Sequence, residues 1–189
     1  MSKSTCYFRS PGKKIGFLGA SRVIPVASWN ATSTKPGMFT TYDPKILVDE
    51  IKKLREQCDY LVVYVHWGIE RSERPEDYQR SLGKQYIDAG ADVVIGSPSH
   101  VLQGVEYYKG KPIVYSLGNF IFGSSIPKTA LLKVQWMAGK QLTFVPGTSS
   151  AGYTRVLENE AQKADFASYM TGISYGVTIE DDGTVVPQG

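Results

Sequence analysis

His66 and His100 are the only histidines in this 189-residue chain, and each follows an apolar stretch. His66 comes directly after residues 60–65 (YLVVYV), and His100 follows residues 92–95 (DVVI) after a short polar loop. Neutral imidazole binds zinc, manganese or iron, and it also transfers protons near neutral pH. Both histidines are therefore candidate catalytic residues and candidate metal ligands.

Two further polar side chains complete the candidate site. Glu70 follows His66 by four residues, and Asn119 comes after the apolar residues 113–117 and a glycine. A carboxylate suits the same divalent metals, and an amide oxygen either adds a ligand or orients a phosphate. We therefore interpret His66, Glu70 and His100 as metal ligands, with Asn119 as a fourth catalytic residue. In an alternative, a histidine acts as a general acid and Glu70 tunes its pKa.

Each of these residues also has a purely structural interpretation. A histidine at a strand end often only donates hydrogen bonds to backbone carbonyls. Glu70 is close enough in sequence to pair in solvent with Arg71 or Arg74. Asn119 is a residue type that tolerates a left-handed turn. Trp67, beside His66, is expected to pack in the core rather than to bind a ligand.

The elements around these residues predict how they meet. Residues 14–20, 60–65 and 92–95 read as strands, and the last two are separated by a helix over 75–89. A strand–helix–strand unit has a right-handed crossover, so its two strands are parallel. Ligands of open α/β sheets bind beyond the carboxyl ends of such strands. The sequence therefore predicts that His66 and His100 lie at one edge of a largely parallel sheet.

Two amphipathic helices are expected on this sheet. The first begins at Asp43-Pro44, and the second runs from about residue 75 to a stop at Gly90. Periodicity of 3.6 residues assigns buried faces to both helices. These faces consist of Leu47, Ile51, Leu54 and Cys58 in the first helix and of Tyr78, Leu82 and Tyr86 in the second.

The second half of the chain predicts β-hairpins. One joins residues 105–108 to 113–117, another joins 131–137 to 141–145 around Gly139, and a strand, turn and strand end the chain from 176 onward. A short helix is expected near 158–170, and residues 21–41 are expected to be loop. Residues 1–13 read as a loose N-terminus, and residues 14–189 read as one α/β domain with flanking helices.

Composition limits the class of protein. The net charge is +3 and the basic residues are scattered, which argues against nucleic acid as a partner. No apolar run reaches the roughly 18 residues of a membrane span, and residues 1–12 contain no export signal, so any such signal lies outside this chain. Cys6 and Cys58 are far apart and leave the redox compartment undecided.

Four blocks of the sequence resemble the bacterial capsule synthesis protein family, also known as CapA or PGA_cap. The likeness runs from about residue 14 to the turn at 182–183 and is specific in the order and spacing of the blocks, which are 66–70 (HWGIE), 86–96 (YIDAGADVVIG), 100–106 (HVLQGVE) and 115–120 (YSLGNF). The resemblance implies a sheet sandwich similar to calcineurin-like metallophosphoesterases, with a two-metal centre at strand ends. It also implies a role in poly-γ-glutamate capsule biosynthesis or export on the extracellular side of the cell envelope.

The chain departs from the family pattern in two places. Family members carry a further histidine in the loop that here reads 96–100 (GSPSH), and their N-terminal motifs are absent from this sequence. The resemblance thus implies the C-terminal part of a longer protein or a shortened relative. A two-metal centre needs ligands for both ions. We therefore expect this chain to bind at most one divalent metal (Mn, Zn or Fe), and weakly.

Two functional hypotheses follow. With its missing half, the protein is a metal-dependent hydrolase of a phosphoester or of an amide-linked polymer, in which metal activates water. Alternatively, it is a non-catalytic module that binds the anionic polymer or serves as a scaffold for other proteins of an envelope complex.

Overall fold

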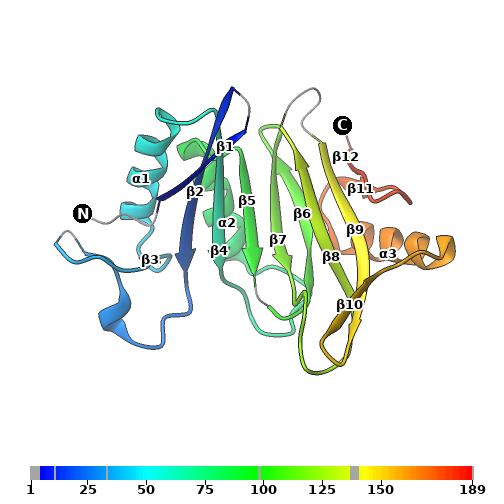
Figure 1. The fold of residues 1–189 in the computed structure, drawn as a ribbon. Coiled ribbons are helices and arrows are strands. Elements are labelled where there is room, and N and C mark those ends of the chain that lie inside the picture. The colour runs from blue at the N-terminus through cyan, green and yellow to red at the C-terminus, as the bar shows by residue number, and fades with distance from the viewer. Residues whose placement is uncertain (1–4, 11, 33, 98, 137–140, 189) are drawn as a thin grey trace. The chain divides into compact units, whose positions relative to one another are not determined.

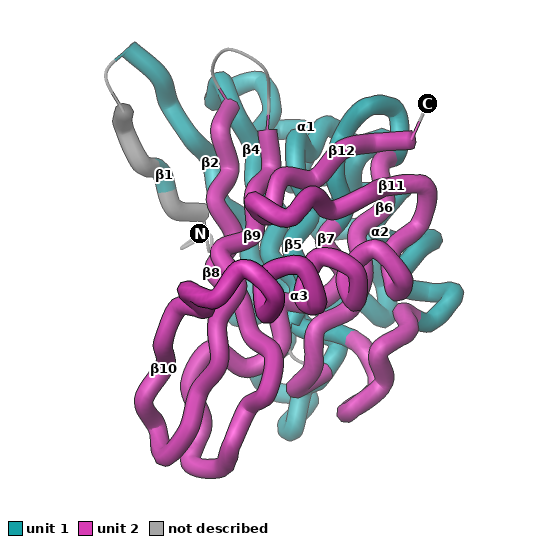
Figure 2. The backbone as a smooth tube through the Cα atoms, turned by 90° about the vertical axis from the view of Figure 1, so that its right-hand side faces the viewer, with its two compact units in different colours: residues 1–67, 76–97, 108–113 teal, residues 68–75, 98–107, 114–189 magenta. Residues whose placement is uncertain are grey.

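The computed structural model describes residues 5–10, 12–32, 34–97, 99–136 and 141–188. It contains a mixed, mostly parallel sheet with the strand order β1-β2-β4-β5-β7-β6, three helices and C-terminal hairpins (Figure 1). The α/β class is therefore confirmed, while the likeness to a metallophosphoesterase sandwich stays a prediction. The chain divides into two compact units (Figure 2). Unit 1 is residues 1–67, 76–97 and 108–113, and unit 2 is residues 68–75, 98–107 and 114–189.

The parallel strands of unit 1 match the predicted ones. The strand β2 (Lys13–Ser21) pairs in parallel with β4 (Tyr60–His66), and β4 pairs in parallel with β5 (Val93–Ser97). A two-residue strand, β3 (Phe39–Thr40), differs from the prediction, because it lies within residues 21–41, which were expected to be loop, and it pairs in parallel with β2. The apolar run of β4 arises because this strand lies between two neighbours, and its Leu61, Val63 and Val65 are fully buried.

The N-terminal segment differs from the prediction. Residues 5–10, expected to belong to a loose N-terminus, form β1 (Thr5–Ser10), which pairs antiparallel with β2. A turn at Gly12, whose φ of 75° suits glycine, joins the two strands. Tyr7 and Phe8 are adjacent and have polar neighbours, which is weak evidence for a strand in isolation, so the pairing depends on the stronger β2 beside it.

Two helices pack against each other and against the strands of unit 1. The first, α1 (Lys45–Arg55), follows Asp43-Pro44 and buries Leu47, Ile51 and Leu54, as predicted. Cys58, the fourth residue of the predicted face, lies beyond the end of the helix and is half-buried. The second, α2 (Asp77–Ala89), ends at Gly90, but its buried stripe is turned by about one residue from the predicted face and consists of Gln79, Gly83, Tyr86, Ile87 and Ala89.

The turned stripe of α2 has a local physical cause. Gln79 accepts a hydrogen bond from the Glu76 backbone N–H at 2.9 Å, so its polar side chain is satisfied while buried. A Cβ atom at Gly83 would lie 3.0 Å from Ile113 Cγ2, so the missing side chain lets the helix approach that residue closely. A polar residue and a glycine thus form the stripe that apolar periodicity assigned to Tyr78 and Leu82.

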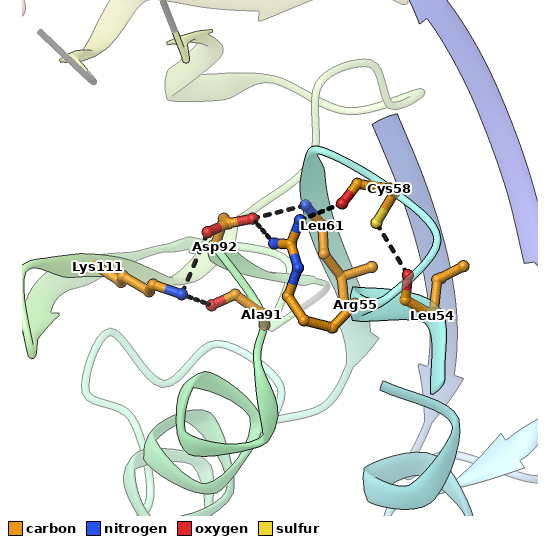
Figure 3. Close-up of polar contacts among 7 residues, drawn as sticks. All are labelled: Leu54, Arg55, Cys58, Leu61, Ala91, Asp92 and Lys111. Atoms are coloured by element: carbon orange, nitrogen blue, oxygen red, sulfur yellow. Dashed lines mark hydrogen bonds and ion pairs between the residues drawn. The ribbon is translucent and has the colours of Figure 1, made fainter. Parts of the chain in front are cut away.

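The carboxylate of Asp92, just before β5, binds groups from several elements of unit 1 (Figure 3). Asp92 accepts hydrogen bonds from the Arg55 guanidinium and, at 2.9 Å, from the Leu61 backbone N–H, and it pairs with Lys111 at 3.2 Å. Its side chain is only 14% exposed. Arg55 also donates to the Cys58 carbonyl. This group, which we call the Asp92 cluster, ties the end of α1 to β4 and β5.

The thiol of Cys58 gives a test of this local structure. Cys58 is a free thiol that donates to the Leu54 carbonyl, and burial raises its pKa while the charge of Arg55 opposes the rise. Because the thiolate is the reactive form, a raised pKa lowers the reactive fraction at any given pH. In a Cys6→Ser background, we expect iodoacetamide to modify Cys58 more slowly in the folded than in the unfolded protein at about pH 8. Equal rates in the two states would contradict this placement.

Unit 2 is built mainly from the predicted hairpins. The strands β6 (Leu102–Tyr108) and β7 (Lys111–Leu117) neighbour each other and contribute most of their residues to it. The strands β8 (Ile126–Gln135) and β9 (Gln141–Ser150) are antiparallel as predicted, although Gly139 lies outside the described residues. The predicted terminal strands are β11 (Val177–Ile179) and β12 (Val185–Pro187), which are also antiparallel.

Two elements of unit 2 complete the fold. The strand β10 (Tyr153–Val156) was not predicted and pairs with β9 after a turn at Ala151-Gly152, where both residues have positive φ. The helix α3 (Glu160–Ile173) confirms the predicted helix and begins at Asn159, whose side chain accepts from two backbone N–H groups. The core of this unit is one apolar cluster that includes Leu102, Val105, Val114, Leu142, Phe144, Phe166 and Met170. Among the described residues, no helix is long and apolar enough to span a membrane.

Candidate functional site

The centre of the candidate site in unit 2 is a hydrogen bond between two predicted site residues. His100 Nδ1 lies 3.0 Å from Asn119 Oδ1, and both side chains are half-buried. When Nδ1 carries the proton, it donates to this amide oxygen, and Nε2 is then the nitrogen that accepts a proton or binds a cation. The Phe122 ring packs edge-on against the imidazole, with 5.9 Å between the ring centroids. The bond to Asn119 and the packing of Phe122 therefore orient the imidazole of His100.

The backbone next to His100 and Asn119 is held in place by hydrogen bonds from side-chain hydroxyls. Ser116 Oγ donates to the Val101 carbonyl at 2.9 Å, and Thr129 Oγ1 donates to the Asn119 carbonyl at 2.7 Å. Gly118 has a φ of 60°, and a Cβ there would lie 2.8 Å from the Val101 carbonyl carbon. The left-handed residue in this turn is thus Gly118, not Asn119. The turn-former interpretation of Asn119 is wrong, and its side chain instead binds the imidazole.

Residues 68–75 are hydrogen-bonded to residues 99–103, the segment that contains His100. The Arg71 backbone N–H donates to the Ser99 carbonyl at 2.6 Å, and the buried Gln103 side chain donates to the carbonyls of Ser72 and Arg74. Arg71 and His100 both have a φ of 62°, which is uncommon for residues other than glycine. Left-handed backbone of this kind costs about 1 kcal/mol or more per residue and persists where surrounding bonds enforce it.

A pocket of about 530 Å³ opens beside the His100–Asn119 pair, entirely within unit 2. Its lining mixes charged, hydroxyl and apolar side chains and includes Glu70, Arg71, Glu73, His100, Asn119, Phe122, Ser124, Ser125, Lys128 and Tyr169. Three of the four residues predicted from sequence, namely Glu70, His100 and Asn119, therefore line one pocket. We call it the His100 pocket.

Glu70 is directed to an arginine rather than to His100. Its carboxylate lies 3.9 Å from Arg71 Nε, and the two side chains are 68% and 84% exposed, respectively. The predicted alternative, in which Glu70 pairs with Arg71 in solvent, is confirmed. An exposed pair at this distance contributes less than about 1 kcal/mol to the free energy of unfolding, so another ion can readily replace either partner.

The far wall of the His100 pocket consists of residues that sequence reasoning missed. Tyr169 Oη donates to Glu73 at 2.9 Å, although the two residues are 96 positions apart. Burial, followed by the hydrogen bond to Glu73, raises the pKa of Tyr169, so this hydroxyl stays protonated. Lys128 Nζ lies 4.5 Å from the Tyr169 ring centre and 3.0 Å from Asp165. The only sequence signal for this wall was the place of Tyr169 in the helix predicted near 158–170, since Lys128 precedes the predicted hairpin at 131–145.

His66 belongs to unit 1. It is the last residue of β4, and it lines a second, mainly apolar pocket of about 490 Å³ together with Ser21, Trp29, Met38 and Tyr64. The following residue, Trp67, is fully buried and stacks on Tyr86 with 6.3 Å between ring centroids, which confirms its predicted packing role. The convergence of His66 with His100, Glu70 and Asn119 stays a prediction, as do their assigned roles.

The residues of the His100 pocket do not by themselves fit a metal centre. His100 offers only Nε2 as a ligand, because Nδ1 is engaged by Asn119, and the Glu70 carboxylate is exposed and paired with Arg71. Within the part of the chain that the structure describes, no group of three or more His, Cys, Asp or Glu side chains is placed to hold a metal ion. We therefore derive no catalytic step through a metal for this chain.

Comparison with known proteins places the chain in a family. Residues 2–124 match the family described as "Bacterial capsule synthesis protein PGA_cap", and these residues include His66, His100 and Asn119. The match covers more than half of the chain. The chain therefore belongs to the bacterial capsule synthesis protein family, and the resemblance predicted from the four sequence blocks is confirmed.

Two curated relatives illustrate the relationship. The chain is 37% identical to the "PGA biosynthesis protein CapA" of Bacillus subtilis (strain 168) over 127 residues, which are 67% of this chain and 33% of the relative. It is 36% identical to the "Capsule biosynthesis protein CapA" of Bacillus anthracis over 131 residues, which are 67% of this chain and 31% of the relative. The matched region thus spans about a third of the length of these relatives.

Proposed function

We propose that this protein takes part in the biosynthesis or export of a poly-γ-glutamate capsule on the extracellular side of the cell envelope. The observation that carries the proposal is the family match over residues 2–124. It is supported by relatives named for PGA and capsule biosynthesis that share more than a third of the aligned residues. Other proteins of an envelope complex are expected as further partners.

Within this role, we propose that the His100 pocket binds a segment of the anionic polymer. Poly-γ-glutamate presents one free carboxylate per residue, and the guanidinium of Arg71 matches a carboxylate in a two-pronged geometry. Its ion pair with Glu70 is exposed and long at 3.9 Å, so a ligand carboxylate can replace Glu70 at little cost. The bond from the Arg71 N–H to Ser99 holds the backbone of Arg71 at the rim of the pocket.

Other lining groups of the His100 pocket suit the amide backbone of such a chain. The imidazole of His100 and the hydroxyls of Ser124 and Ser125 donate or accept hydrogen bonds, and Phe122 supplies an apolar surface for methylene groups. Lys128, 34% exposed at the wall, adds a second cation. The pocket therefore offers partners for the carboxylates, amides and methylenes of a γ-linked chain.

A second candidate function is metal-dependent hydrolysis of a phosphoester or of an amide-linked polymer. The observation that favours it is that Glu70, His100 and Asn119, all with metal-ligating side chains, line one pocket. A complete site would require further ligands, with His66 as one candidate. Manganese or zinc bound stoichiometrically by the protein, and lost in a His100→Ala variant, would favour this function.

The polymer-binding proposal is tested by titrating the protein with a γ-linked glutamate oligomer in a calorimeter. We expect saturable binding that weakens as salt is raised to about 0.5 M. Arg71→Gln should weaken binding by about tenfold, because it removes a charge-assisted pair worth about 1.5 kcal/mol. The matched control is Arg74→Gln, which removes the same charge from an exposed residue of the same loop that does not line the pocket.

The control should change the affinity by less than about twofold, because a distant exposed charge is screened. Equal losses in the two variants would show that only net charge matters, and an absence of saturable binding would remove the His100 pocket as a polymer site.

A further inference from the structure

The cations that line the His100 pocket already have counterions. Arg71 is paired with Glu70 at 3.9 Å, and Lys128 is paired with Asp165 at 3.0 Å. Each pair is neutral as a unit, so the two cations add no net positive charge to the pocket. An anionic chain therefore meets these cations only by displacing a carboxylate.

The carboxylate of Glu73, which lines the same pocket, has no such counterion. Within the part of the chain that the structure describes, no lysine, arginine or histidine is paired with it. Its hydrogen-bond donor is the hydroxyl of Tyr169 at 2.9 Å, and this hydroxyl stays protonated because burial and the bond to Glu73 raise its pKa. A phenol orients a carboxylate oxygen without cancelling its charge. Glu73 is therefore oriented but not neutralised.

The backbone on both sides of Glu73 is fixed by a buried side chain. Gln103, which is fully buried, donates to the carbonyls of Ser72 at 2.9 Å and Arg74 at 3.2 Å. The Arg71 backbone, two residues before Glu73, is held by its own hydrogen bond of 2.6 Å. Charges whose geometry is already set lose less entropy when they bind a ligand. A cationic and an anionic side chain thus reach one pocket from a single fixed segment.

We propose that the His100 pocket binds the amino-terminal residue of a poly-γ-glutamate chain, with its α-carboxylate on Arg71 and its α-ammonium on Glu73. The assignment rests on the proposed function and specifies which part of the polymer the pocket accepts. A γ-linked chain carries a carboxylate on every residue but a single ammonium, at its amino terminus, where both groups share the α-carbon. An internal residue presents an amide N–H instead of this ammonium, and so leaves Glu73 without a cation.

A free amino acid has the same two groups, so the length of the ligand distinguishes the two sources. The pocket of about 530 Å³ also includes Phe122, Ser124 and Ser125, which suit the methylenes and amides of the following residues. We therefore expect a γ-linked oligomer to bind more tightly than free glutamate.

The test compares, by calorimetry, a γ-linked glutamate oligomer that has a free amino terminus with the same oligomer acetylated there. The unaltered protein should bind the free oligomer about fivefold more tightly, because acetylation removes the ammonium, and free glutamate about tenfold more weakly than the free oligomer. Glu73→Gln should weaken binding of the free oligomer about fivefold and bind the two oligomers equally. This loss has the opposite sign to a general charge effect, since removing a negative side chain favours an anionic ligand.

Glu70→Gln is the matched control, because it removes the same charge from the same segment. Glu70 competes with the ligand for Arg71, so this variant should bind both oligomers a few-fold more tightly and keep the preference for the free amino terminus. Tyr169→Phe removes the donor that orients Glu73, so it should weaken only the free oligomer, by a few-fold. Binding of the acetylated oligomer should not weaken in Glu73→Gln or Tyr169→Phe, which reports that the pocket is intact.

Equal affinity of the unaltered protein for the free and acetylated oligomers would overturn the amino-terminal assignment and leave the proposed polymer site standing. The same holds if Glu70→Gln and Glu73→Gln change binding alike, or if free glutamate binds as tightly as the oligomer. Failure of both oligomers to bind would overturn the assignment together with the polymer site itself. A preference for the free terminus that Glu73→Gln abolishes and Glu70→Gln keeps supports the amino-terminal residue as the ligand.

Discussion

Asp92→Ala is expected to lower the free energy of unfolding by about 3 kcal/mol, because it leaves two cations and a backbone donor without their shared carboxylate. Arg55, Lys111 and the Leu61 N–H all bind Asp92, which is 14% exposed (Figure 3). When one partner of a nearly buried ionic group is removed, the remaining charges stay partly desolvated without compensation. The loss of stability is therefore larger than the stability that the intact pair contributes. Urea denaturation of the purified variant measures this loss directly.

Asp88→Ala is the matched control for the Asp92 cluster. Asp88 also accepts from a lysine and a neighbouring side chain, with Lys109 Nζ at 2.5 Å and Tyr108 Oη at 3.2 Å. Its side chain is 43% exposed, so solvent replaces these partners, and the expected loss is much smaller than that of Asp92→Ala. Equal losses for Asp88→Ala and Asp92→Ala would contradict the role assigned to burial in the cluster.

Gly104→Ala is expected to destabilise unit 2 by about 3 kcal/mol. A Cβ at Gly104 would lie 2.0 Å from the carbonyl oxygen of Ile173, and a backbone atom cannot give way as a flexible side chain does. The neighbouring contacts fix this approach, because Val105 N–H donates to Ser174 Oγ at 3.0 Å and the Val105 carbonyl accepts from Tyr175 at 2.8 Å. The strand β6 and the end of α3 would have to separate.

Gly172→Ala is the matched control in the same unit, and it is expected to stabilise the protein rather than to destabilise it. This glycine lies near the end of α3, and a Cβ there would meet no atom within 4 Å. Alanine is favoured over glycine in a helix, so we expect the variant to be more stable by about 0.5–1 kcal/mol. Thermal unfolding of the two variants side by side distinguishes a close backbone approach from a general intolerance of larger residues. Destabilisation of similar size in both would contradict the packing described for Gly104.

The apolar elements of the fold were predictable because their patterns are local. Strong runs such as 60–65 match a strand covered on both sides, and the spacing of Leu47, Ile51 and Leu54 matches the buried stripe of α1. The stripe of α2 was predicted one residue away from its real position. There the buried positions are a glycine and a glutamine, whose burial depends on Ile113 and on a cap, and no hydrophobic pattern records either.

Other elements were missed because they depend on their neighbours. The strand β1 is short and mixed in polarity, and it forms by pairing with β2. The strand β10 has only four residues, three of them largely exposed, and it follows a turn with two left-handed residues. Sequence periodicity over so few positions cannot separate a strand from a loop.

The candidate site was predictable only as a set of residue types at strand ends. That rule selected His100 and Asn119, which the structure joins by a hydrogen bond, and Glu70, which it directs toward Arg71. It could not find Tyr169 and Lys128, because long-range packing of α3 and β8 brings them to the pocket.

The imidazole signals of His100 test the central claim most directly. The chain has only two histidines, so a nitrogen–proton correlation spectrum contains two imidazole sets, and His100→Gln assigns them. Adding a γ-linked glutamate oligomer should shift the His100 imidazole and the Asn119 side-chain amide together, in a saturable way, because the polymer occupies the pocket that they line. Saturable binding of the oligomer with both signals unmoved would contradict the account.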